Sequence, residues 1–265
     1  MLGKRYALGV TLSVVIITYN EEANLGRTLE SVMPLVCEGK GEIIVVDSGS
    51  TDRTVEIAQS FGAKVFVEEW KGYAAQKNSA IEKASRDWIL SLDSDEEVGA
   101  GLEEEIEKAT RSASATAFWI SRKNLFLNRW MKHGGYWPDR KLRLFKRGAA
   151  FFENRLVHED AKLMSGTTEQ LQHSLIHHSY PTLSDYIDHM NRYSSLGAEM
   201  AVAKGQGRFS VLNIVVRPWA TFVYNYFFRL GFLDGREGLL LHLYHAVYVS
   251  WKYAKAWELG RGSKD

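Results

Sequence analysis

Acidic side chains recur in this sequence shortly after apolar runs. Asp93 and Asp95 follow the run at residues 88–92, and Glu21 and Asp47 follow two earlier runs. On an extended chain, side chains two residues apart point to the same side, so Asp93 and Asp95 can share one face. A divalent cation relieves the repulsion between two such carboxylates, and Mg²⁺ and Mn²⁺ both prefer oxygen ligands. The spacing therefore predicts that Asp93 and Asp95 hold a metal–diphosphate.

Each of these acids also has a plainer interpretation. Residues 93–97 would cap a helix expected near Gly101, because acids are favoured at helix N-termini. Asp47 would simply hydrogen-bond the turn that follows it. Position favours the functional interpretation, since ligands of open α/β sheets lie beyond the carboxyl ends of the strands.

The apolar runs before the acids are typical of a parallel sheet. The first two are continuously apolar and rich in β-branched residues, which indicates strands covered on both faces. The expected strands are residues 12–18, 42–47, 64–67 and 88–92, and the expected helices are residues 22–36, 51–61, 73–84 and 103–110. This alternation predicts an α/β fold with a mostly parallel, nucleotide-binding sheet flanked by helices.

The pattern changes after about residue 115. Strand-like runs at residues 118–120, 141–145 and 171–176 are separated by long stretches rich in Trp, Tyr, His and Arg, which are typical of binding loops. Helical spacing returns in a C-terminal extension. The expected domains are residues 1–180, with halves of about 1–112 and 113–180, and a helical extension at residues 181–265.

Four segments carry a resemblance to a known family. Residues 14–21 (VVIITYNE), 43–52 (IIVVDSGSTD), 72–78 (GYAAQKN) and 92–96 (LDSDE) resemble the family 2 glycosyltransferases in order and spacing. The resemblance implies the GT-A fold and an inverting transfer from a nucleotide sugar. It implies that Asp93 contacts the nucleotide and that Asp95 is the leading metal ligand. It places around the uridine Thr18, Tyr19, Glu21, Asp47 and Gln76, with Ser48, Ser50 and Asn78 as weaker candidates.

Inversion by one in-line displacement requires a general base that deprotonates the acceptor hydroxyl. The resembled family places a catalytic acid after the metal motif, where this sequence has residues 157–160 (VHED). Glu159 is the first candidate for the base and Asp160 the second. His158 is a weaker candidate that would otherwise contact the acceptor or hydrogen-bond the neighbouring acids.

Basic and aromatic residues precede the candidate base. Arg140 and Arg143 lie in an alternating run, where they would contact phosphate or form the solvated face of an edge strand. Residues 124–137 contain Gly134 and would form a loop that closes on the sugar. Histidines elsewhere, His177 among them, are interpreted as structural.

The C-terminal extension contains two aromatic segments, residues 210–228 and 238–251. Neither offers the roughly 18 apolar residues of a spanning helix. Their Trp, Tyr, Arg and Lys content favours an interfacial helix pair on a membrane surface over helices that pack on the domain or form a dimer interface. This tail, together with residues 138–147 (PDRKLRLFKR) and 157–159 (VHE), is similar to family 2 glucosyltransferases of lipopolysaccharide core assembly. That similarity implies a lipid-linked glycan acceptor.

Bulk composition limits the alternatives. Among 265 residues, 33 Lys and Arg balance 32 Asp and Glu, so no nucleic-acid partner is expected. The lone Cys37 and the lack of a signal-peptide cleavage site after the basic and apolar N-terminus favour the cytoplasm, on the inner face of the membrane. Nucleotidyl transfer would need a glycine-rich loop after the first strand, where residues 18–26 hold one glycine. A non-catalytic nucleotide-sugar-binding protein is the other alternative.

Overall fold

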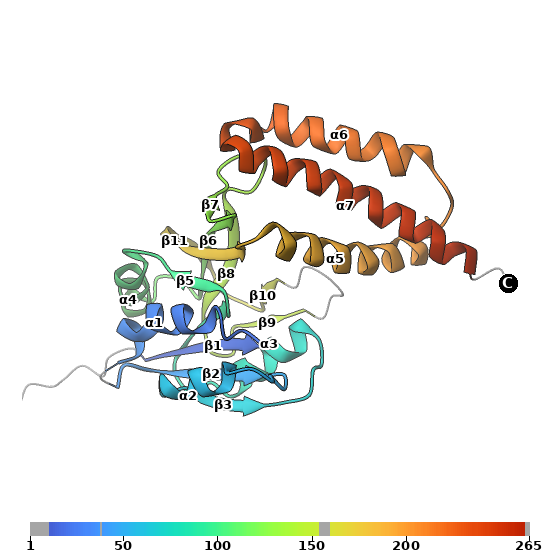
Figure 1. Ribbon diagram of the computed structural model, residues 1–265. Helices are drawn as coiled ribbons and strands as arrows, with labels where there is room; N and C mark the ends of the chain where they lie inside the picture. Colours follow the sequence, from blue (N-terminus) through green and yellow to red (C-terminus); the bar gives the residue numbers. More distant parts are fainter. Residues whose placement is uncertain (1–10, 38, 154–159, 263–265) are drawn as a thin grey trace, which may run out of the picture. The chain divides into compact units, whose positions relative to one another are not determined.

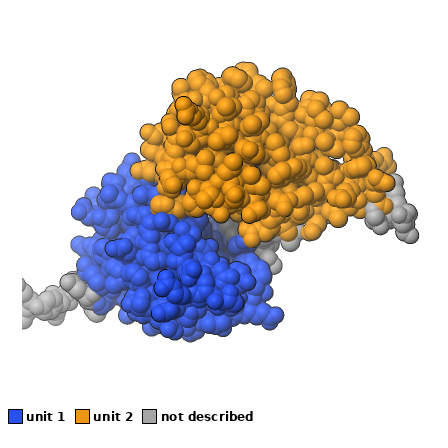
Figure 2. All heavy atoms as spheres, in the orientation of Figure 1, with its two compact units in different colours: residues 1–122, 140–177 blue, residues 123–139, 178–265 orange. Residues whose placement is uncertain are grey.

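The computed structural model describes residues 11–37, 39–153 and 160–262. The chain divides into two compact units (Figure 2). Unit 1 comprises Met1–Arg122 and Arg140–His177, and unit 2 comprises Lys123–Asp139 and His178–Asp265. The expected boundary at residue 180 lies close to the point where the chain enters unit 2 for the second time. The excursion of residues 123–139 into unit 2 was not expected.

The first half of unit 1 is a parallel sheet with helices on both faces (Figure 1). Its strands are β1 (Leu12–Thr18), β2 (Gly41–Asp47), β3 (Lys64–Val67) and β4 (Trp88–Asp93), and its helices are α1 (Leu25–Val36), α2 (Thr54–Ser60) and α3 (Tyr73–Glu82). Alternate residues of β1 enter two different cores. Val14 packs with the apolar face of α1 and Val15 with that of α3. The predicted burial of β1 on both faces is confirmed.

The second half of unit 1 extends this sheet in the order β4-β8-β6-β11-β5. The elements are β5 (Glu96–Val98), α4 (Leu102–Ser112), β6 (Ala117–Phe126), β8 (Asp139–Lys146) and β11 (Thr168–Tyr180). A separate two-stranded sheet pairs β9 (Ala150–Phe152) with β10 (Ala161–Leu163). Strand β8 runs antiparallel to β4 and lies between β4 and β6, so the edge-strand interpretation of its basic run is wrong.

The capping interpretation of residues 93–97 is also wrong. Glu96 begins β5 and pairs with His177 of β11, and helix α4 starts only at Leu102. The N-cap of α4 is Gly101, which makes no side-chain capping hydrogen bond. The acids after β4 therefore lie in and beside a strand-to-strand turn.

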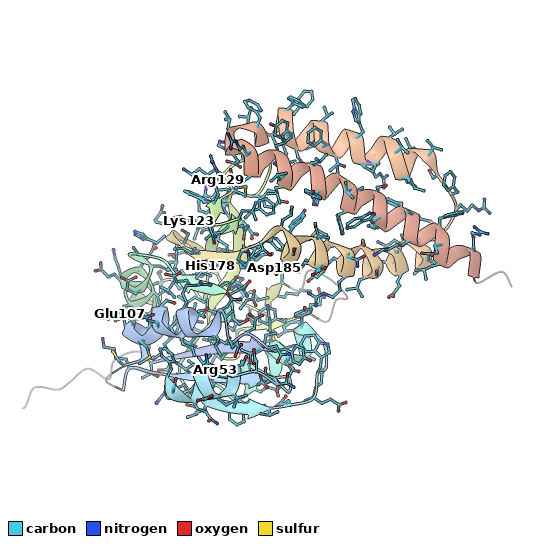
Figure 3. All side chains as sticks on the ribbon, in the orientation of Figure 1. Arg53, Glu107, Lys123, Arg129, His178 and Asp185 are labelled. Atoms are coloured by element: carbon cyan, nitrogen blue, oxygen red, sulfur yellow. The ribbon has the colours of Figure 1, made fainter. Side chains whose placement is uncertain are left out.

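Unit 2 consists of a short strand and a group of helices. These elements are β7 (Arg129–Trp130), α5 (Leu183–Ala203), η1 (Leu212–Val216), α6 (Arg217–Val223), η2 (Tyr224–Phe228), η3 (Gly231–Asp234) and α7 (Gly235–Gly262). Thr182 and Asp185 form a capping box that starts α5, and Asp185 is labelled in Figure 3. Helix α7 packs against both α5 and α6 (Figure 1).

Residues 212–228 form one nearly continuous helix in which η1 and η2 are π-helical. Pro218 lies in the first turn of α6 and has no backbone N–H, so it cannot bond the carbonyl of Ile214. The hydroxyl of Ser250, from α7, donates to that carbonyl at 2.8 Å instead. This contact explains how the helix passes through Pro218. In the described part of the chain, no helix is long and apolar enough to cross a membrane.

Candidate active site

The carboxyl ends of β1, β2 and β4 meet at one edge of the sheet. In register, Thr18 of β1 lies beside Asp47 of β2, and Ile17 of β1 lies beside Asp93 of β4. The sequence predicted this convergence, because parallel strands end at the same side of a sheet.

The carboxylate of Asp47 is fully buried and holds the loop that follows it. It accepts hydrogen bonds from the hydroxyls of Thr18 (2.9 Å) and Ser50 (2.5 Å). It also accepts the backbone N–H groups of Gly49 (2.9 Å) and Ser50 (2.8 Å). Four donors use about all the lone pairs that a carboxylate offers. The turn interpretation of Asp47 is therefore confirmed, and Asp47 also fixes the side chain of Thr18.

The loops after β1 and β2 are joined to each other. Asn20 takes the left-handed conformation at φ 54°, which Asn tolerates better than most residues. Its backbone N–H donates to the hydroxyl of Ser50 at 2.8 Å, and its side-chain oxygen accepts the N–H of Thr51 at 2.8 Å. Beside it, the Tyr19 ring is 58% exposed. The two loops thus form a rigid rim with an accessible aromatic ring.

Glu21 lies close to the acids of the β4 turn. Burial raises the pKa of its carboxyl, as does repulsion from Asp95, while the hydrogen bond from Asn24 at 3.0 Å opposes both. A carboxyl whose pKa is raised in this way favours a nearby cation or hydrogen-bond donor.

Gln76 is fully buried on α3. Its amide nitrogen donates to the hydroxyl of Ser48 at 3.2 Å, while its amide oxygen has no hydrogen-bond partner among the described residues. An unsatisfied buried acceptor is rare and indicates a missing donor. Asn78, on the same helix, makes two 2.8 Å hydrogen bonds with the backbone of Phe152, which attaches α3 to β9.

Asp93 belongs to a buried ionic cluster, formed by Lys77, Asp93, Glu96, Arg122 and Arg143. One Asp93 oxygen lies 2.7 Å from Lys77 and the other 2.5 Å from Arg143. Glu96 accepts from Arg143 at 2.6 Å and from Arg122 at 2.8 Å. Its second oxygen accepts the backbone N–H of Asp93 at 3.0 Å, which fixes the turn.

The three cations of this cluster outnumber its two carboxylates. Burial raises the pKa of Asp93, but the attraction of Arg143, Lys77 and Arg122 is stronger and lowers it well below the usual range. Burial likewise lowers the pKa of Arg143, and its carboxylate partners raise it further than burial lowers it. Asp93 is thus held ionised at the strand tips.

Asp95 pairs with His177, a histidine that the sequence analysis interpreted as structural. Its Oδ2 atom lies 3.2 Å from Nε2 of His177, on β11. Burial raises the pKa of the Asp95 carboxyl, but the charge and hydrogen bond of His177 lower it by more. The two side chains are 25% and 17% exposed, so the pair is accessible at its rim. Carboxylate oxygen and imidazole nitrogen are both ligands of divalent metals.

Within residues 11–37, 39–153 and 160–262, no group of three or more His, Cys, Asp or Glu side chains is arranged around a common metal position. Mg²⁺ is nevertheless commonly held by one or two carboxylates while phosphates of the substrate complete its coordination. Asp95 supplies such a carboxylate, with the imidazole of His177 beside it, whereas both Asp93 oxygens already face protein cations.

Comparison with known proteins identifies the class. Residues 13–170 match the family model described as glycosyl transferase family 2. The chain belongs to glycosyltransferase family 2. Its members share an inverting mechanism, and the architecture described above is the GT-A fold.

Relatives and solved structures agree with this family. The chain is 30% identical over 258 residues to "Lipopolysaccharide core biosynthesis glycosyltransferase LpsC" of Rhizobium meliloti, covering 93% of this chain and 92% of that protein. It is 31% identical over 265 residues to "Uncharacterized glycosyltransferase RT0209" of Rickettsia typhi, covering 96% and 89%. The fold resembles a mannosyltransferase of Pyrobaculum calidifontis, solved with GDP-Man and Mn²⁺, with a TM-score of 0.52, 17% identity and coverage of 96% and 86%.

The other predicted site residues of this glycosyltransferase lie in different settings. Arg143 is 3% exposed and bound to carboxylates of the ionic cluster, and its contact with phosphate stays a prediction. Arg140 is exposed on the same strand. Asp160 is exposed and lies 3.0 Å from Lys141. His158 and Glu159 lie outside the described residues.

Proposed function

We propose that this glycosyltransferase transfers one hexose from a UDP-sugar to a hydroxyl of a lipid-linked glycan such as lipopolysaccharide core, with the help of Mg²⁺ or Mn²⁺. The observation that carries the proposal is the Asp95–His177 pair beside the ionic cluster. A fixed set of charges near the leaving diphosphate stabilises the negative charge that develops there.

The donor nucleotide is proposed to bind at the tips of β1, β2 and β4. Thr18, Tyr19, Glu21, Ser48 and Gln76 would line the uridine site, with Thr18 held by Asp47. The unpartnered oxygen of Gln76 supports a ligand that donates a hydrogen bond, as the uracil N3–H does. The choice of uridine rests on the motif resemblance, and the experiment below tests it against guanosine.

The divalent cation is proposed to bind at Asp95 and His177. Bound there, it would supply Lewis-acid stabilisation of the departing diphosphate. Asp93 contributes as a half-buried, ionised carboxylate whose backbone N–H is fixed by Glu96. The Mn²⁺ bound by the mannosyltransferase of the same fold supports the use of a divalent cation.

Glu159 is proposed as the general base that removes the acceptor proton, and Asp160 as the second candidate. The ion pair of Asp160 with Lys141 at 3.0 Å supports this order, because it directs that carboxylate toward a protein cation. Arg140 and His158 are proposed to contact an anionic acceptor, and the exposure of Arg140 suits that role.

The name of the LpsC relative supports lipopolysaccharide core as the acceptor. A lipid-linked acceptor places the enzyme at a membrane, and we propose the inner face of the cytoplasmic membrane, reached through the C-terminal helices. No nucleic acid takes part, and a homodimer is the alternative use of the same helices.

The direct test is release of nucleoside diphosphate during turnover. The purified protein would be incubated with truncated lipopolysaccharide core, with UDP-glucose, UDP-galactose, UDP-N-acetylglucosamine or GDP-mannose, and with Mg²⁺, Mn²⁺ or EDTA. Acceptor-dependent UDP release that EDTA abolishes supports the proposal.

Three other results would contradict it. Release of nucleoside diphosphate from GDP-mannose alone would overturn the uridine assignment. Undiminished release in EDTA would overturn the proposed need for a divalent cation. Pyrophosphate release, or metal-dependent binding of the donor without turnover for any acceptor, would overturn sugar transfer itself.

A further inference from the structure

The helix of residues 211–228 presents a continuous row of exposed apolar side chains. We call this row the apolar stripe. Its members are Val211, Leu212, Val215, Val216, Trp219, Tyr224, Phe227 and Phe228, with exposed fractions from 46% to 75%. Soluble proteins rarely expose contiguous apolar surface of this kind, and where they do it marks an interaction site.

The two π-helical segments keep this stripe straight. Its members recur at steps of four residues, from Val211 and Leu212 to Phe227 and Phe228. On an ideal α-helix, each four-residue step overshoots one turn by about 40°, so four steps would carry the row about 160° around the helix. The π segments η1 and η2 close i→i+5 hydrogen bonds and therefore hold more residues per turn. They offset the drift, and the apolar side chains stay on one side.

Apolar side chains continue beyond the helix end. Leu230, Phe232 and Leu233 are 46%, 43% and 51% exposed around the short helix η3. The surface therefore includes one whole helix face and the turn that follows it.

The charges along this part of unit 2 are mainly positive. Lys204, Arg208, Arg217, Arg229 and Arg236 are all exposed. The two acids among residues 204–243 are engaged inside the unit. Asp234 is 3% exposed and lies 2.8 Å from His133, and Glu237 is half-buried and lies 3.4 Å from Arg129, labelled in Figure 3. Arg229 also lies over the ring of Tyr224, at 5.7 Å.

We propose that the apolar stripe lies in the plane of an anionic phospholipid surface, with its aromatic rings inserted at the headgroup level and the arginines paired with lipid phosphates. Aromatic and apolar residues on one face, with arginines beside them, are the composition of an in-plane interfacial helix. The exposed Lys and Arg side chains, beside two acids that already have protein partners, make this surface electrostatically complementary to anionic lipid. A homodimer contact through the same surface would bring two positively charged surfaces together and would gain no such attraction.

This inference deepens the proposed function and rests on its membrane contact, but it is independent of the donor, the cation and the base. Vesicle binding needs none of them. A failed binding experiment with intact UDP release would therefore contradict the stripe alone.

The test is co-sedimentation of the full chain with two kinds of vesicle, one of phosphatidylcholine and one of equal parts phosphatidylcholine and phosphatidylglycerol. We expect the protein to bind the anionic vesicles. Binding to pure phosphatidylcholine vesicles should be weaker, and high salt should weaken binding to the anionic vesicles. The double variant Val216→Glu/Trp219→Glu should bind about tenfold more weakly or worse. The double variant Arg208→Gln/Arg236→Gln should lose about fivefold in vesicle affinity for each charge removed, and only on anionic vesicles.

The matched control is Met164→Glu, an exposed apolar residue of unit 1 at 58% exposure, which should bind like the wild type. The oligomeric state of each protein would be measured by light scattering. The proposal is overturned if the wild type does not sediment with anionic vesicles. It is also overturned if the wild type is a dimer in solution that the stripe variant converts to monomer. The sedimentation result is obtained from the wild type alone, so the proposal stays falsifiable even if a variant misfolds.

Discussion

Nε2 of His177 lies 3.2 Å from Oδ2 of Asp95, which joins the last long strand of unit 1 to the turn that follows β4. Beside this pair, Glu96 accepts the backbone N–H of Asp93 and binds two arginines. The second half of the unit therefore fixes the acidic turn that the first half presents at its strand tips.

Replacing Asp95 by alanine should remove the leading metal ligand. We expect turnover to fall at least about 100-fold, because loss of the cation removes several kcal/mol of stabilisation from the departing diphosphate. Steady-state UDP release at saturating Mn²⁺ measures the change. Glu104→Ala, an exposed acid on α4, is the control and should keep the wild-type rate. An Asp95→Ala enzyme with a near-normal rate would contradict the cation site.

Glu159→Gln should lower turnover by about 10²-fold or more while UDP binding stays intact, because a general base acts only on the acceptor proton. Asp160→Asn should have a smaller effect, since Asp160 is exposed and paired with Lys141. Turnover assays and calorimetric titration with UDP separate the two steps. The reverse order, with Glu159→Gln active and Asp160→Asn inactive, would transfer the role of base to Asp160.

Arg143→Met should destabilise the fold by about 3 kcal/mol, because it leaves the buried carboxylate of Glu96 and the half-buried one of Asp93 with fewer cations. Urea unfolding measures the loss. Arg140→Met changes an exposed residue of the same strand and should remain within about 0.5 kcal/mol of the wild type. Equal stability of the two variants would show that the ionic cluster contributes little.

Acid should weaken unit 2 through His242. This side chain is 1% exposed, and burial lowers its pKa from 6.5 to about 4, assisted by His245 and opposed by Asp234. The folded state thus favours the neutral ring. Titration of His242 therefore costs no stability above about pH 6.5. As the pH drops from 6.5 toward 4, it lowers the free energy of unfolding by about 3 kcal/mol in total.

The comparison of wild type with His242→Leu isolates this contribution, because the other titrating groups remain in both proteins. Urea unfolding at a series of pH values should show a smaller loss of stability for the variant between pH 6.5 and 4. Parallel curves for the two proteins would contradict the prediction.

Much of the nucleotide half could be predicted because each of its signals is local. The strands β1, β2 and β4 are short β-branched runs, and parallel pairing alone brings their acidic ends together. The role of Asp47 in its own turn was likewise available as an alternative, since Asp commonly binds backbone N–H groups two and three residues ahead.

The pairing of Asp95 with His177 could not be predicted in the same way. It depends on the antiparallel contact of β5 with β11, and β5 is only a three-residue strand. The acids around it fit a helix cap equally well by composition. The burial of Arg143 was missed for a similar reason, since an alternating strand has the same pattern at an edge as between two neighbouring strands.

The π turns of residues 212–228 were also beyond local reasoning. A proline inside a helical segment ordinarily ends or kinks the helix, but at Pro218 the carbonyl left without its N–H partner accepts the hydroxyl of Ser250 from α7. Only the tertiary contact shows that the helix continues.

The central claim is that acids at neighbouring strand tips gather a cation and, through it, the diphosphate of the donor. A crystal grown with UDP and Mn²⁺, with anomalous data collected to locate manganese, tests it most directly. We predict a manganese peak bound by Asp95 and by the UDP diphosphate, with His177 at the same ion and the uracil beside Gln76. Manganese bound elsewhere, or UDP bound with no contact to the Asp93–Asp95 turn, would contradict the account.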